Sequence, residues 1–125
     1  GCVDMVNFGE RDSVPNRFED RNFYIHNPQI TLMRTTAEEC AEIGRIIATK
    51  SNANETRVAI LNPLKAVSEI NGDGQTFHDP TADKALFEAI HENAKVEVID
   101  HDLEINDPEF PKACAQKLLE LINRS

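Results

Sequence analysis

The chain has 125 residues, enough for one ordinary domain with a buried core, and its composition of 40% hydrophobic and 28% charged residues is typical of a globular protein. Its 22 acidic and 13 basic residues give a net charge of −9, which argues against binding to a nucleic-acid backbone or to an anionic membrane surface. We therefore expect a single domain over residues 1–125 whose partners include neither nucleic acid nor membrane.

The first predicted unit is a short β run at residues 23–26 followed by a capped helix. An extension of this strand to Met33, beyond the break at Asn27-Pro28, is an open alternative. Thr36 with Glu39 three residues later forms a capping box, which predicts that the helix starts there. The apolar face of this helix consists of Cys40, Ile43, Gly44 and Ile47. We interpret its glycine as a point of close packing on a sheet.

The second predicted unit begins with a strand at residues 58–61, which is continuously apolar, as expected of a strand buried on both faces. Asp79 as N-cap and Pro80 at the first helical position predict the start of the next helix. The third unit repeats this order, with a strand at residues 96–99 and a helix that opens at Asp107-Pro108. A glutamate within the third strand indicates a position near the edge of a sheet.

Strands that alternate with helices over 30 to 40 residues are typical of βαβ units and a parallel sheet. We therefore predict an α/β fold, a three-layer sandwich with a mainly parallel, Rossmann-like sheet and helices on both faces. Residues 3–8 are a candidate fourth strand.

The sequence contains neither a glycine-rich phosphate-binding loop nor the HExxH and GxSxG motifs, so no cofactor follows from its motifs. Ligands of open parallel sheets bind beyond the carboxyl ends of the strands. The candidates by this rule are Asn7, Gly9, His26, Asn27, Arg34, Thr35, Thr36, Asn62, Lys65, Asp100 and His101.

Two of these positions carry a positive charge. Arg34, followed by Thr35 and Thr36, precedes a helix, where free N–H groups and a guanidinium can hold an anion. The competing interpretation is an ordinary capping box beside a solvated arginine. Lys65 follows the second strand and can bind an anion or, once desolvated, act as a base; a plain solvated lysine is the alternative.

The histidines and cysteines predict no metal site. Neither His78-Asp79 nor the cluster at residues 100–102 has the second His or Cys that a tetrahedral site needs at suitable spacing. His91, late in a predicted helix, is interpreted as a surface residue. Three widely spaced cysteines and an N-terminal stretch unlike a signal peptide indicate a reducing, cytoplasmic location.

Several segments, in order, resemble one family. They are residues 1–9, residues 26–36 (HNPQITLMRTT), residues 63–65 (PLK), residues 74–80 (GQTFHDP) and residues 105–108 (INDP). Together they are similar to the C-terminal domain of the uncharacterised (UPF) family that includes the tomato mosaic virus resistance protein, often described as an ATP-binding-domain family.

This resemblance implies an intact protein about three times as long, with two α/β domains that face a cleft. ATP would belong mainly to the N-terminal domain, which is absent here, and plant members act against virus through contact with a viral replication protein. The family-like polar positions then become candidates for lining the cleft: Asn7, His26, Asn27, Arg34, Thr35, Lys65 and His78.

Two functions remain open at this stage. The first is an enzyme, or half of one, that acts on a small anionic or nucleotide-like ligand; the second is a non-catalytic interaction or sensor module. The missing N-terminal domain is an expected partner. Because its loss would uncover a sheet edge and an apolar surface, we also expect a homo-oligomer.

Overall fold

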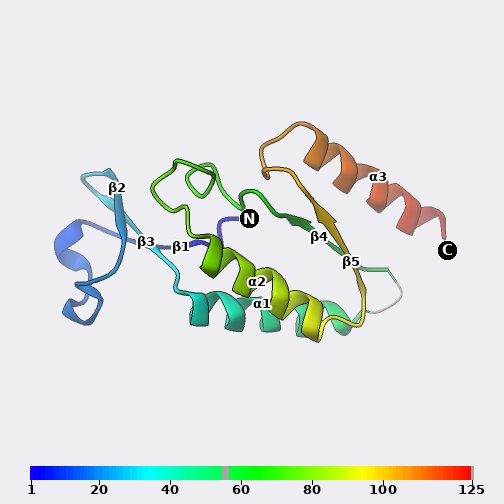
Figure 1. The fold of residues 1–125 in the computed structure, drawn as a ribbon, viewed down its shortest axis with the longest axis horizontal. Coiled ribbons are helices and arrows are strands. Elements are labelled where there is room, and N and C mark those ends of the chain that lie inside the picture. Colours follow the sequence, from blue (N-terminus) through cyan, green and yellow to red (C-terminus); the bar gives the residue numbers. More distant parts are fainter. Residues whose placement is uncertain (55–56, 125) are drawn as a thin grey trace.

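The computed structural model describes residues 1–54 and 57–124, which form two sheets joined by a pair of packed helices (Figure 1). A three-stranded antiparallel sheet has the order β1-β3-β2, and a two-stranded parallel sheet pairs β4 with β5. The strands are β1 (Met5–Phe8), β2 (Phe23–Asn27), β3 (Ile30–Arg34), β4 (Ala59–Pro63) and β5 (Glu97–His101). The α-helices are α1 (Ala37–Asn52), α2 (Pro80–Asn93) and α3 (Glu109–Asn123), and short 3-10 turns occupy Arg11–Ser13 and Asn16–Phe18.

The segment after residue 22 forms a hairpin instead of one strand of a parallel sheet. Asn27 accepts a hydrogen bond at its Oδ1 from the Gln29 amide (2.9 Å), and Pro28 fixes the backbone inside this turn. The chain therefore reverses, and β2 pairs antiparallel with β3. The predicted role of residues 23–26 in a parallel sheet is wrong for this reason. The predicted strand at residues 3–8 is confirmed as β1, which pairs antiparallel with β3.

The other two predicted strands are confirmed as a parallel pair. β4 and β5 run side by side in a register that places Asn62 opposite Asp100, and α2 makes the crossover between them. The α/β class is thus correct, but the mainly parallel Rossmann-like sheet is wrong, because within residues 1–54 and 57–124 only these two named strands pair in parallel. Among the described strands β5 pairs with β4 alone and so lies at a sheet edge, as Glu97 within it predicted.

The starts of α1 and α2 follow the predicted capping chemistry, whereas the predicted cap of the third helix is wrong, because its N-cap is Pro108. The Glu39 amide donates to Thr36 Oγ1 (3.2 Å) and the Thr36 amide donates to Glu39 Oε2 (3.0 Å), which completes the capping box. Asp79 caps α2 by accepting from the Ala82 amide (3.0 Å), with proline in the first turn. The side chain of Asp107 accepts from the first amide of α3 (3.0 Å), so this helix begins one residue later than an Asp N-cap would place it.

Gly44 packs against a helix, not against a sheet as predicted. A Cβ atom added to Gly44 would lie 2.5 Å from the Leu86 carbonyl oxygen and 2.9 Å from the Ala89 Cβ. The missing side chain therefore lets α1 and α2 approach closely. The core formed at this contact includes Cys40, Val67, Ala82, Leu86, Phe87 and Ile90.

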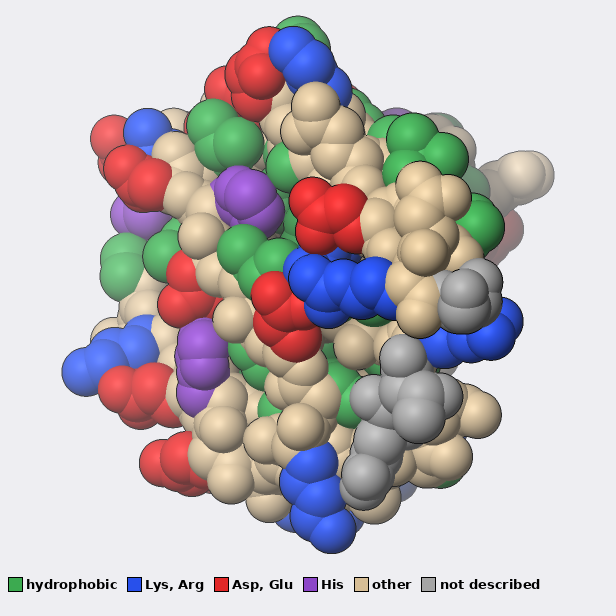
Figure 2. Space-filling model, turned by 90° about the vertical axis from the view of Figure 1, so that its right-hand side faces the viewer, with side chains coloured by type: hydrophobic (Ala, Val, Ile, Leu, Met, Phe, Trp, Pro, Cys, Tyr) green, Lys and Arg blue, Asp and Glu red, His purple; other side chains and the backbone are tan. Residues whose placement is uncertain are grey.

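The α3 helix lies on the opposite side of β4 and β5 from α1 and α2, so three layers exist only around the parallel pair (Figure 1). The face at the right of Figure 1 carries acidic and basic side chains intermixed with apolar ones (Figure 2). Among the described residues, no helix combines the length and apolar character needed to cross a membrane.

Candidate functional site

A polar pocket of about 700 Å³ opens beside α2, near the carboxyl ends of β4 and β5. One wall is a stripe of α2 at helical spacing, formed by Pro80, Asp83, Lys84, Phe87, Glu88 and His91. The other side comes from the loops after the strands and from β5 itself, with Leu64, Lys65, Asp73, His78, Asp100 and Glu104. The pocket therefore lies where the strand-end rule places a ligand site.

A buried ion pair between Arg34 and Asp83 reaches the pocket through Asp83, which lines it. Arg34 Nη2 contacts Asp83 Oδ1 at 2.5 Å, and the side-chain amide of Asn71 donates through Nδ2 to both oxygens of Asp83 (3.1 and 3.0 Å). Arg34 also donates through Nε to the Phe77 carbonyl (2.9 Å). Burial raises the pKa of Asp83, and the hydrogen bonds from Asn71 and Arg34 offset part of this effect. The network attaches the loop at residues 64–79 to the end of β3.

The three residues predicted as an anion site before α1 all bond to protein groups. Arg34 is 4% exposed and contacts protein atoms through all three of its guanidinium nitrogens. Thr35 is buried and its hydroxyl donates to the Val3 carbonyl (3.0 Å), while Thr36 caps α1. The observed contacts of these residues stabilise the fold, and binding of an anion by them stays a prediction.

Three other predicted site residues belong to the antiparallel sheet. Asn7, His26 and Asn27 are exposed in β1 and β2, and none of them lines the pocket beside α2. Asn27 shapes the hairpin turn, and His26 lies near Tyr24, with ring centroids 6.3 Å apart. The structure therefore does not bring these three residues together with Lys65 and His78.

Three predicted residues line the pocket: Lys65, His78 and Asp100. The Lys65 side chain is 56% exposed, and its ammonium lies 3.9 Å from Asp102, at the outer limit of an ion pair. His78 Nδ1 lies 3.4 Å from the Asn71 carbonyl and its Nε2 lies 3.8 Å from Asp73. Long, exposed pairs of this kind contribute little to stability, so both side chains can exchange their partner for a ligand at low cost.

A second hydrogen-bonded network joins His91 and Asp100, which line the pocket, to the buried Asn62. His91 Nε2 lies 2.9 and 3.0 Å from the two Asp100 oxygens, and Asn62 donates to Asp100 Oδ1 (3.0 Å). Burial raises the pKa of Asp100, but the hydrogen bonds from Asn62 and His91 outweigh it and leave the pKa below the ordinary value. The carboxylate thus orients the imidazole of His91, which sequence analysis placed among ordinary surface residues.

The pocket carries both charge signs. Lys65 and Lys84 share the lining with acidic side chains, and the Lys84 ammonium is 3.4 Å from Glu88. Within residues 1–54 and 57–124 no three His, Cys, Asp or Glu side chains are grouped as metal ligands. This arrangement can hold a small polar molecule through a few charge-assisted hydrogen bonds.

The fold and the site define an α/β domain in which a parallel strand pair and its crossover helix carry a polar pocket, while an antiparallel sheet is attached through a buried Arg–Asp pair. The family comparison is specific: the C-terminal domain of an uncharacterised protein family, UPF0261, matches residues 1–122, and the chain belongs to this family.

The relatives include bacterial and plant proteins. Over 99% of its own length, the chain is 43% identical to a UPF0261 protein of Clostridium tetani. Over 92% of its own length, it is 48% identical to a UPF0261 protein of Mesorhizobium japonicum. It is 35% identical over its whole length to the ToMV resistance protein Tm-1 of Solanum lycopersicum. The chain spans 31% of the Clostridium protein, 30% of the Mesorhizobium protein and 17% of the tomato protein.

Proposed function

We propose that this domain supplies one wall of a ligand cleft in the UPF0261 proteins, and that the pocket beside α2 binds a small anionic or nucleotide-like ligand. The supporting observation is that Lys65 and His78 lie in one pocket at the strand ends with only long contacts to carboxylates. The other wall of the cleft would come from the N-terminal domain, to which any ATP would bind mainly. We further propose a cytoplasmic protein that forms homo-oligomers.

The acidic side chains of the pocket restrict the ligand. Asp73, Glu88, Asp100 and Glu104 would repel a ligand of high negative charge. The best fit is a molecule with one anionic group, which pairs with Lys65 and the pocket's other cations, and with hydroxyl or amino groups that donate to the carboxylates.

For an enzymatic form of this proposal, His91 is the proton-transfer group. An imidazole held by a carboxylate keeps its orientation and can take up or release a proton at a ring nitrogen. Asp100 would position it, and Asn62, buried in β4, would position Asp100.

A second candidate function is a protein-interaction module. Leu118 and Leu119 of α3 are 58% and 59% exposed, which provides apolar contact surface on one helix. The tomato relative is named for resistance to ToMV, and an interaction role for this chain would follow from that similarity.

Calorimetric titration with inorganic phosphate and, separately, with ATP tests the ligand proposal. Whichever of the two probes binds, we expect Lys65→Gln to lower its affinity roughly tenfold, or by about 1.4 kcal/mol. Lys112→Gln is the matched control, because Lys112 is similarly exposed (62%), forms a long ion pair with Glu109 and lies outside the pocket. Equal affinities for the two variants would remove Lys65 from the site.

A further inference from the structure

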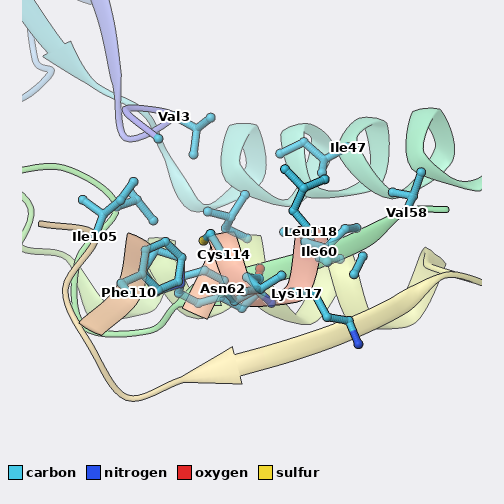
Figure 3. Close-up of a pocket in the computed structure, with 18 of the residues that line it drawn as sticks. Val3, Ile47, Val58, Ile60, Asn62, Ile105, Phe110, Cys114, Lys117 and Leu118 are labelled. Atoms are coloured by element: carbon cyan, nitrogen blue, oxygen red, sulfur yellow. The ribbon is translucent and has the colours of Figure 1, made fainter. Parts of the chain in front are cut away.

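The outer edge of β4 borders an apolar groove. β4 pairs with β5 on one side, and among the described strands none pairs with its other side. At this other side a groove of about 450 Å³ runs between α1 and α3, with β4 along its floor (Figure 3). Side chains from both helical layers line it, including Ile47 of α1 and Cys114 and Leu118 of α3.

The lining of the groove suits an apolar polypeptide segment better than a charged ligand. Among the described residues of the lining, Lys117 is the one buried charge, and it is already paired with Glu97 (2.6 Å) and Glu120 (3.3 Å). The side chains around it are mainly aliphatic, such as Val58 and Ile60. Arg57, also on the lining, is exposed, so a charged small molecule in the apolar interior of the groove would lose hydration without gaining a partner.

The geometry matches the site of a missing strand. The free edge of a strand presents unpaired N–H and C=O groups in a row, which a further strand can satisfy. Helices above and below that position are the normal surroundings of a central strand in a layered α/β sheet, where both strand faces are apolar. At the groove, apolar side chains of α1 and α2 provide one cover and those of α3 provide the other.

We propose that this groove holds an apolar β-strand of the same polypeptide in the UPF0261 proteins, supplied by the part of those proteins outside the region that this chain matches. The available length supports this occupant, because the matching region is only 31% of the Clostridium tetani protein. A second copy of the chain, the homo-oligomer expected when this edge is left uncovered, is the competing occupant, and a net charge of −9 on each copy weakens that pairing. This inference does not depend on the ligand proposed for the pocket beside α2.

The test is a chimera in which this chain replaces the matching region of the Clostridium tetani protein, compared with the chain alone. Hydrogen exchange of the β4 amides should be roughly tenfold slower or more in the chimera, since the added strand protects them. Light scattering of the same samples separates the two occupants. Equal exchange in both proteins, or protection that appears only when the chimera dimerises, would overturn the proposal.

Two neighbouring leucines provide a matched pair of variants. Leu118 lines the groove and Leu119 does not, yet both are exposed to the same extent in the chain alone. In the chain alone, Leu118→Asp and Leu119→Asp should melt within about 2 °C of each other. In the chimera, Leu118→Asp should melt at least roughly 4 °C below Leu119→Asp, because its charge would be buried against the strand. Equal melting temperatures in the chimera would contradict the proposed strand.

Discussion

Replacing Gly44 by alanine tests whether the α1–α2 contact holds the helical layer together. Alanine at an exposed helix position would stabilise the helix by about 1 kcal/mol relative to glycine. At Gly44, however, the new Cβ would lie 2.5 Å from the Leu86 carbonyl oxygen, 2.9 Å from the Ala89 Cβ and 3.3 Å from the Ile90 amide nitrogen. Two of these neighbours are backbone atoms, so the helices must move apart.

Overpacking of this kind costs about 1–3 kcal/mol, and contact with backbone places Gly44→Ala at or above the upper end of that range. After the gain in helix propensity, the free energy of unfolding should fall by roughly 2 kcal/mol. For a chain of 125 residues this corresponds to a decrease of roughly 6–10 °C in the melting temperature.

Thermal and urea unfolding followed by circular dichroism measure this effect, and Lys50→Ala is the control. Lys50 is exposed on the same helix, so its replacement should change the free energy of unfolding by no more than about 0.5 kcal/mol. A Gly44→Ala protein that melts at or above the temperature of the parent would refute the close contact of α1 with α2.

Two other contacts give predictions. Asp83→Ala leaves Arg34 buried without its carboxylate, so urea unfolding should show a loss of about 3–5 kcal/mol; a loss below about 1 kcal/mol would show that the pair is solvated. The Arg21 guanidinium, which donates to both oxygens of Glu39, holds the pKa of that carboxyl below its ordinary value of 4.5. The pair therefore contributes stability above pH 4.5 that is lost as the pH falls through the lower, folded-state pKa. Thermal melts across this acid range should show a shallower loss for Arg21→Gln than for the parent, and parallel curves would contradict this.

Local signals predicted much of the fold because they depend on neighbouring residues. The capping box at Thr36 and the Asp79-Pro80 cap are set by chemistry within one helical turn, and both are confirmed. The partner of a strand is a long-range property. Asn27-Pro28 reversed the chain between two short β runs, so the first strand paired with its immediate neighbour rather than with β4.

The site was predictable where it follows directly from the strand order. Lys65 lies at the pocket because it comes just after β4. Asp83 was missed because an acidic residue in the first turn of a helix looks like a partner of the helix dipole. Its actual contacts, Arg34 and Asn71, are 49 and 12 residues away in the chain. His91 was missed because its partner lies on the next strand.

The binding of an anionic ligand in the pocket beside α2 is tested most directly by the imidazole resonances of the histidines during a titration with inorganic phosphate. His78 and His91 line the pocket, whereas His26 is exposed on β2 outside it. Occupation of the pocket should shift the resonances of His78 and His91 in a saturable manner and leave those of His26 unchanged. Saturable shifts at His26 with none at His78 and His91 would contradict this assignment and move the ligand to the antiparallel sheet.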